Sequence, residues 1–284
     1  MQERNPQISV VISAYNAEKY VREAIDSIIN QSFTDFECII VDDGSTDKTK
    51  EIIKSYEDKR IVFIENNHDF IASLNKGMKM AKGKYIARMD ADDIMHPDRL
   101  KIQHTIMETE PSITVCGTWM KHFGEGIAAD SLARSIAGLV ELPLLRFLQG
   151  NFVFHPTVMI RREFLIQNQM QYENYSCAED LKLWSEMAKR GGVFYIEDQP
   201  LLHYRISDSQ VSKQNREEQQ TTAERILGDN LRYLFDRNSE EHPELSTLLN
   251  SFLELHEKDL ISFGGMLQMA HRILYTNKSR LSLA

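Results

Sequence analysis

The sequence predicts an α/β fold, a mainly parallel sheet flanked by helices, with a helical extension at its C-terminal end. Short runs of apolar, often β-branched residues alternate with stretches of helical spacing along residues 8–89. The connections between them are short, and this alternation is typical of a parallel sheet with helices on both faces. After residue 214 the apolar residues keep helical spacing, which predicts the extension.

The four expected strands are short and dominated by isoleucine, valine and phenylalanine. They are predicted at residues 8–13, 36–41, 61–64 and 85–89. Apolar runs of this length are typical of parallel strands that are covered on both faces.

Helices are expected between these strands. Residues 17–31 carry apolar side chains at helical spacing, and Asn16 is expected to cap that helix. Ser45 or Thr46 is expected to cap the second helix, and the third is expected to stop near Gly83.

The pattern is less regular further along the chain. Residues 118–150 show no clear period, residues 153–160 look extended and residues 178–190 regain helical spacing. Residues 193–206 predict one or two strands broken by Pro200. The helical spacing after residue 214 is interrupted near residues 238–243.

Composition excludes several classes of protein. The 284 residues carry a formal net charge of −9, which argues against a broad basic face for nucleic acid, so no nucleic-acid partner is expected. The three cysteines form no C-x-x-C pair, which favours reduced thiols in a cytoplasmic protein. The polar residues 1–7 do not predict a signal peptide, and no apolar run is long enough to span a membrane.

Polar side chains follow three of the four expected strands. They are Tyr15 and Asn16, Asp42 and Asp43, and Asp90 and Asp92. Because ligands of parallel sheets bind beyond the carboxyl ends of the strands, this position predicts a binding site.

The run Asp90-Ala91-Asp92-Asp93 is the strongest single motif. Closely spaced carboxylates at a strand end suit a hard divalent cation, Mg²⁺ or Mn²⁺, that bridges to diphosphate oxygens. The alternative is a capped turn, with Asp92 or Asp93 at the start of a helix near Pro97.

Other candidates have a structural reading beside the functional one. A carboxylate of the pair Asp42-Asp43 is placed to accept an imide N–H or a ribose hydroxyl, although Asp-Gly is also a common turn pair. Arg88 and Arg205 are placed to balance phosphate charge, and the alternative for Arg88 is an ion pair with a neighbouring carboxylate. Glu179 and Asp180 precede an amphipathic helix, as a cap or as a general base.

Two histidines, His155 and His203, complete the candidates, although a lone histidine is more often structural. A nicotinamide-dinucleotide site is not expected, because Ser13-Ala14-Tyr15-Asn16 stands where G-x-G-x-x-G is needed. Residues 124–129 match G-x-G-x-x-A, but an acid lies where pyrophosphate would bind. No Walker A lysine loop is present.

These motifs together resemble the inverting family 2 glycosyltransferases, which have the GT-A, Rossmann-like fold. The resemblance covers roughly residues 6 to 210. Its segments are ISVVISAYN at 8–16, DDGSTD at 42–47, LNKG at 74–77, AKGKYIARMDADD at 81–93, PDRL at 97–100, His155-Pro156 and AEDLKL at 178–183.

The resemblance implies inverting transfer of a sugar, a hexosyl or N-acetylhexosaminyl group, from a nucleotide diphosphate sugar. A UDP-linked donor, Mg²⁺ or Mn²⁺, and a glycan or lipid-linked acceptor in polysaccharide biosynthesis are expected. The residues implied in donor binding are Ala14, Tyr15, Asn16, Asp43, Arg88, Asp90, Ala91 and Asp92. Asp90 and Asp92 would hold the metal, and Asp180 would be the catalytic base.

The sequence departs from the family pattern at four places, of which the first, Ser13 or Ala14 where many members have proline, is minor. Residues 67–70 replace a segment that usually contains glycine, and Leu74 stands where many members have arginine. Ser207 stands where a histidine is frequent, which leaves a third metal ligand open, with His203 as a weak substitute.

The expected domains are a glycosyltransferase domain at residues 1–210 and a helical extension at 211–284. Residues 1–117 would be the nucleotide-binding half and 118–210 the acceptor half. Two alternative functions rank after the glycosyltransferase. The first is a non-catalytic subunit that binds nucleotide sugar, and the second is a sugar-phosphate nucleotidyltransferase.

The apolar face of residues 245–274 must be buried. Packing within the chain is ranked first, a homodimer second and peripheral contact with the inner face of the membrane third.

Overall fold

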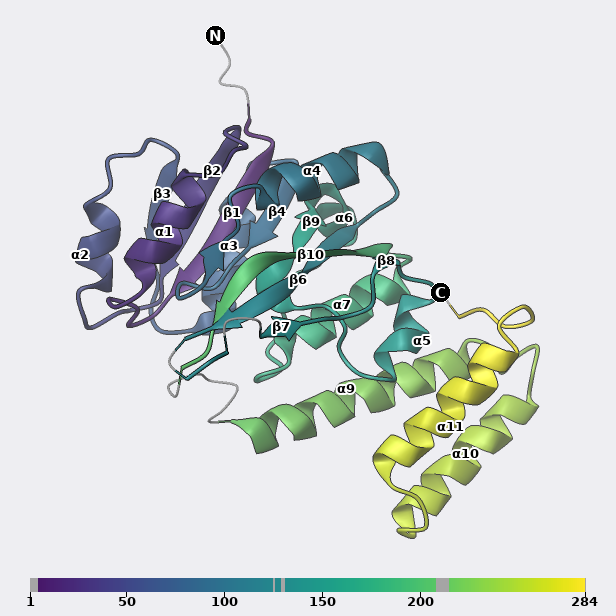
Figure 1. Cartoon of the computed structure of the whole chain (residues 1–284). Helices are drawn as coiled ribbons and strands as arrows, with labels where there is room; N and C mark the ends of the chain where they lie inside the picture. The colour runs from purple at the N-terminus through teal and green to yellow at the C-terminus, as the bar shows by residue number, and fades with distance from the viewer. Residues whose placement is uncertain (1–4, 125, 129–130, 208–214, 284) are drawn as a thin grey trace. The chain divides into compact units, whose positions relative to one another are not determined.

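The computed structural model describes residues 5–124, 126–128, 131–207 and 215–283 (Figure 1). The chain divides into two compact units. The first unit comprises Met1–Val140, Val153–Asn174 and Gly192–Gln210. The second unit comprises Glu141–Phe152, Tyr175–Gly191 and Val211–Ala284. The units interleave along the chain, so the expected domain boundary at residue 210 stays a prediction.

The first unit is built on one sheet with the strand order β3-β2-β1-β4-β9-β6-β10-β5. Strands β1 to β4 are parallel, β9 runs antiparallel to β4 and β6, and β10 is parallel to β6. The mainly parallel α/β class is therefore confirmed. The strands are β1 (Ile8–Ala14), β2 (Phe36–Asp42), β3 (Ile61–Glu65), β4 (Tyr85–Arg88), β5 (Ile94–Met95), β6 (Val115–Phe123), β7 (Leu132–Ala133), β8 (Gly138–Leu139), β9 (Met159–Arg161) and β10 (Phe194–Arg205).

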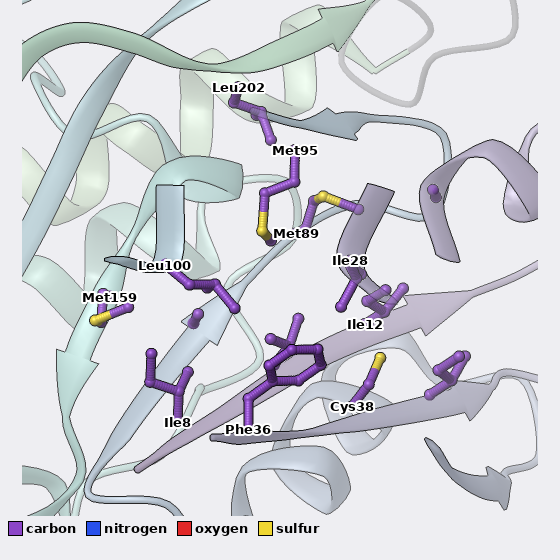
Figure 2. Packing of buried hydrophobic residues seen from close by; sticks show 14 of the residues in the cluster. Ile8, Ile12, Ile28, Phe36, Cys38, Met89, Met95, Leu100, Met159 and Leu202 are labelled. Atoms are coloured by element: carbon purple, nitrogen blue, oxygen red, sulfur yellow. The ribbon is translucent and has the colours of Figure 1, made fainter. Parts of the chain in front are cut away.

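Both faces of this sheet are covered by helices. Alternate β1 residues such as Ile8 and Ile12 join a core with Ile28 of α1 and Leu100 of α4 (Figure 2). On the other face, a Cβ on Gly77 of α3 would lie 2.5 Å from Val11, so the missing side chain lets α3 approach β1. The helices of this unit are α1 (Val21–Ile29), α2 (Thr49–Lys54), α3 (Phe70–Met80), α4 (Arg99–Thr109), the 3-10 turn η1 (His155–Thr157) and α6 (Arg162–Gln167).

Two expected helix caps are wrong. Helix α1 begins at Val21, and the Asn16 side chain instead accepts a hydrogen bond from the Thr46 N–H at 2.9 Å. Helix α2 begins at Thr49, whose N–H donates to Asp47 and not to Ser45 or Thr46. In both cases the polar side chains join two loops, a contact between distant segments that local spacing does not reveal.

The later strands also differ from expectation. Strand β6 occupies part of the segment that seemed irregular from its sequence. Residues 153–160 are only partly extended, because η1 interrupts them before β9. Strand β10 continues past Pro200, where its pairing with β6 shifts register, so proline produces an irregularity and not an end.

The second unit is helical. The helical stretch expected after residue 214 forms three helices over residues 215–283. The break at 237–243 agrees with the expected interruption near residues 238–243, and the second break, at 258–262, was not expected. Helices α10 and α11 both contact α9, and the rings of Phe235 and Phe252 meet edge to face with centroids 6.4 Å apart. Its helices are α5 (Pro143–Phe147), α7 (Glu179–Lys189), α9 (Arg216–Asp236), α10 (Glu244–Glu257) and α11 (Phe263–Thr276).

Among the described residues, the helices are each too short or too polar to cross a bilayer. Cys38 and Cys116 lie in the sheet core, where burial raises the pKa of both thiols to about 12 and keeps them protonated at neutral pH.

Candidate functional site

The loops that follow β1 and β2 are tied to each other. The N–H of Asn16 donates to Ser45 at 3.0 Å, and the N–H of Ala17 donates to Thr49 at 2.7 Å. Since both strands end at the same edge of the sheet, these bonds fix one continuous rim there. Tyr15 stands on this rim with 46% of its surface exposed.

Asp43 is buried behind the rim, and its N–H donates to the Ala14 carbonyl at 2.7 Å. Its Oδ1 accepts hydrogen bonds from the N–H of Asp69 at 2.8 Å and the hydroxyl of Ser73 at 2.7 Å, with the Asn66 amide at 3.3 Å. A residue of a simple Asp-Gly turn would not need these partners from the next loop and helix. Sequence reasoning missed them because their contacts are far apart in sequence.

The second oxygen of Asp43 faces an aromatic pair. His68 Nδ1 lies 3.8 Å from Asp43 Oδ2. The His68 ring stacks on Tyr15 with centroids 4.1 Å apart and planes at 30°. An aromatic face beside a carboxylate acceptor suits a flat heterocycle that carries an N–H group. His68 was not among the expected site residues.

The acidic loop, residues 90–93, follows β4 after one intervening residue, Met89. Arg88, at the end of that strand, is 6% exposed and binds Asp90 with both terminal nitrogens. Nη1 lies 2.8 Å from Asp90 Oδ2, and Nη2 pairs with Oδ1. The ion-pair alternative for Arg88 is thus present in the structure, while its contact with a diphosphate stays a prediction.

The other two carboxylates of the loop are electrostatically crowded. Burial, and then the Asp90 charge, raise the pKa of Asp92 to about 6. The same causes raise the pKa of Asp93 well above its usual range. Within the described part of the chain, the buried Asp93 Oδ2 has no hydrogen-bond partner. A divalent cation would relieve this repulsion, and carboxylate oxygens are the ligands that Mg²⁺ and Mn²⁺ prefer.

The capped-turn alternative for this loop is wrong. Helix α4 begins at Arg99 with Asp98 at its cap position, so neither Asp92 nor Asp93 caps it.

Arg205, at the end of β10, holds the acidic loop through one backbone carbonyl and one carboxylate of the loop. Its Nε donates to the Asp92 carbonyl at 2.8 Å, and its N–H donates to Asp93 Oδ1 at 2.9 Å. Its guanidinium pairs with Glu23 and lies 4.3 Å from the ring centre of Tyr20. The structure therefore gives Arg205 a role in holding the loop, and its expected contact with phosphate stays a prediction.

The backbone of His203 pairs with Ile94, next to the acidic loop, and its ring lies beside Phe123 with ring centroids 6.2 Å apart. Successive side chains of a strand point to opposite faces, so His203 and Tyr204 face opposite sides of β10. Burial, and then the charges of Lys121 and His96, lower the pKa of His203, while burial and then the charge of Asp90 raise the pKa of Tyr204. A role of His203 as a metal ligand stays a prediction. Across residues that the structure describes, no three His, Cys, Asp or Glu side chains are grouped to hold a metal.

His155 is half-buried in the first unit. Its Nε2 forms a 2.7 Å hydrogen bond with the Tyr172 hydroxyl. Burial, and then the charge of Arg88, hold the pKa of His155 well below its usual range, so the ring is neutral at pH 7. Asn75, from the quoted LNKG segment, binds the backbone of Tyr172 through two hydrogen bonds at 2.8 and 2.9 Å.

Arg99 is a second buried cation that the candidates omitted. It is fully buried and donates to the carbonyls of Arg88 and Pro156, each at 2.9 Å. Its Nε also donates to Gln103 at 2.9 Å. Arg99 therefore links the strand end before the acidic loop to the turn η1. Its signal in the sequence was the PDRL segment, but nothing there shows what the guanidinium contacts.

Glu179 and Asp180 belong to the second unit, where they are the first residues of α7. Asp180 Oδ1 accepts from the Leu181 N–H at 2.7 Å, and Oδ2 accepts from the Asn151 amide at 2.9 Å. Glu179 is 8% exposed. Both acids are favourably placed at a helix N-terminus, and Asp180 keeps an orientation that Asn151 helps to set.

Comparison with known proteins gives consistent matches. Residues 9–168 match the family model described as Glycosyl transferase family 2. An uncharacterized glycosyltransferase of Haemophilus influenzae is 33% identical over 271 residues, which cover 90% of this chain and 82% of that protein. The putative teichuronic acid biosynthesis glycosyltransferase TuaG of Bacillus subtilis is 32% identical over 73% of this chain and 82% of its own length.

Solved structures share the fold. S. aureus TarS 1–349 in complex with UDP-GlcNAc aligns with a TM-score of 0.66 and 23% identity, over 88% of this chain and 72% of that chain. The mannosyltransferase PcManGT from Pyrobaculum calidifontis, in complex with GDP-Man and Mn²⁺, aligns with a TM-score of 0.60 and 14% identity, over 99% and 77% of the two chains.

Proposed function

The chain belongs to the family 2 glycosyltransferases, and on that premise we propose that it transfers a sugar from a UDP-linked donor to a glycan or lipid-linked acceptor with inversion of the anomeric carbon. One observation carries the proposal. An aromatic face and a carboxylate acceptor, Tyr15 and Asp43, follow β1 and β2, and the acidic loop follows β4, in the same parallel part of one sheet.

The nucleoside end of the donor would bind at the rim. Tyr15 offers a stacking surface, and Asp43 Oδ2 would accept an N–H of the base while Oδ1 is held by Ser73 and Asp69. Ala14 and Asn16 shape this rim through the backbone and loop contacts described above. These hydrogen bonds fix the Asp43 carboxylate before the donor binds, which reduces the conformational entropy that is lost on binding.

The diphosphate end would bind at the acidic loop. Asp90 and Asp92 would hold Mg²⁺ or Mn²⁺, and Ala91 between them would lie next to the donor. The bound cation would supply Lewis-acid neutralisation of the leaving diphosphate. Arg88 orients the Asp90 carboxylate. Each oxygen of that carboxylate keeps a further lone pair that could bind the cation.

Asp180 would act as the general base. The acceptor hydroxyl would lose its proton to this carboxylate as its oxygen attacks the anomeric carbon, and the bond from that carbon to the phosphate oxygen would break.

The chain would then divide by function. Residues 1–117 would be the nucleotide-binding half, 118–210 the acceptor half and 211–284 an extension.

A donor-hydrolysis screen tests this function. UDP-, GDP- and dTDP-linked hexoses and N-acetylhexosamines would be incubated with the full chain and Mn²⁺, and nucleotide release would be followed. Release from UDP-sugars that EDTA stops is the expected result. Donor binding without release, even with mixed glycan and lipid acceptors, would favour the non-catalytic subunit, and exchange of label with pyrophosphate would favour a nucleotidyltransferase.

A further inference from the structure

His68 lies where a nucleobase would be expected to bind. Its imidazole stacks on Tyr15 with centroids 4.1 Å apart, and its Nδ1 is 3.8 Å from Asp43 Oδ2. The His68 side chain therefore places one ring nitrogen near the Asp43 carboxylate and one ring face on Tyr15. These are the two groups that would bind a base.

There is no room for a third ring in this stack. Stacked carbon atoms need about 3.5–4 Å between planes, so a ring inserted between Tyr15 and His68 would require centroids about 7 Å apart. A base that stacks on this face of Tyr15 and donates to Asp43 Oδ2 must take the position of the imidazole.

We propose that the imidazole of His68 occupies the nucleobase position of the donor site in the free protein and is displaced by the base of a nucleoside diphosphate. The inference rests on the proposed function, because its ligand is the nucleotide part of the donor. Affinity for the donor is then set partly by how tightly the protein's own ring competes.

The backbone of His68 is fixed while its side chain is free to move. His68 has φ 35°, in the left-handed region, and a Cβ on Gly44 would lie 3.1 Å from its N. The following N–H, that of Asp69, is anchored to Asp43. The side chain is 66% exposed. Displacement therefore needs only a change of rotamer toward solvent, and the loop that carries Asp43's partners stays in place.

Titration calorimetry with UDP and Mn²⁺ tests the proposal on the full chain. His68→Ala removes the competing ring, and His68→Asn does so with a residue that adopts the left-handed region readily. Because an aromatic stack of this kind is lost from the free protein, both variants should bind UDP about 2- to 10-fold more tightly. Phe70→Ala, which removes another exposed ring two residues away, is the matched control and should leave affinity unchanged.

The outcomes separate the two proposals. Unchanged or weaker UDP binding in both His68 variants, with a normal control, would overturn the displacement proposal and leave the glycosyltransferase proposal standing. Weaker binding would mean that the imidazole contacts the bound base. If the unmutated chain binds neither UDP nor GDP, both proposals fail together.

Discussion

Replacing Asp92 by asparagine tests the acidic loop through stability as well as activity. In the metal-free protein the carboxylate is ionised at pH 7.5 at a cost, because burial and the Asp90 charge raise its pKa from 3.8 to about 6. The folded state then binds protons more tightly than the unfolded state. Between pH 4 and pH 6 the unfolded state therefore holds fewer protons, and the free energy of unfolding falls as pH rises through this window.

The size of the effect follows from the shift. Two pKa units correspond to about 3 kcal/mol, and since Asp93 shares the same repulsion, we expect Asp92→Asn to recover about 1–3 kcal/mol at pH 7.5. For a chain of this size that is a rise in Tm of about 2–6 °C in EDTA. At pH 4.5, where the unmutated carboxyl is already mostly protonated, the gain should shrink.

Thermal unfolding in EDTA and in Mn²⁺ measures both sides of the argument. Mn²⁺ should raise the Tm of the unmutated chain more at pH 7.5 than at pH 5, because protons compete for the carboxylates. It should leave Asp92→Asn nearly unchanged. Asp198→Asn, at an exposed carboxylate of β10, is the control and should respond to Mn²⁺ like the unmutated chain. The reasoning would be refuted if Asp92→Asn had a lower Tm than the unmutated chain in EDTA, or if Mn²⁺ raised its Tm as much as it raises that of the unmutated chain.

Three further changes test other parts of the site and fold. Asp180→Asn should lower turnover about 10²- to 10⁴-fold with UDP affinity unchanged by calorimetry, and a parallel loss of binding would make Asp180 a ligand or a cap instead of a base. Arg99→Met leaves the carbonyls of Arg88 and Pro156 unpaired, so urea unfolding should show a loss of about 3 kcal/mol, and a loss below 1 kcal/mol would contradict that linking role. Deleting residues after Glu241 removes α10 and α11, which pack on α9, and should give insoluble protein. A truncated chain that stays folded and whose mass in solution falls by half would indicate a dimer, and one that stays folded but no longer binds vesicles would indicate membrane contact.

The first four strands could be predicted because their residues determine them locally. Runs such as that of β1 are apolar and β-branched, both faces of the strand are buried, and short polar turns bound them. The acidic loop was located for the same reason, since Asp90 lies two residues after the end of β4. Strand β6 was missed because its C-terminal half, which contains Lys121 and His122, lacks a continuous apolar run.

The missing parts of the site depend on contacts between distant segments. Ser73 lies on α3 and Asp43 after β2, and only the packing of that helix on the sheet brings the hydroxyl within 2.7 Å of the carboxylate. Asn16 looked like a cap because a cap needs the same short polar side chain that joins two loops. In the same way, the stack of His68 on Tyr15 depends on a left-handed backbone that neither residue's type predicts.

The charges around the acidic loop explain how an acidic chain would bind an anionic donor. In the free protein Arg88 pairs with Asp90, and the guanidinium of Arg205 pairs with Glu23, so the positive charge of each is partly offset by a carboxylate. Asp92 and Asp93 add negative charge at the same place. A diphosphate approaching this loop alone would be repelled, whereas a divalent cation would be attracted first and would then favour the anion. In the free protein the two arginines hold the acidic loop in position, and a divalent cation would add the further positive charge that an anionic donor needs.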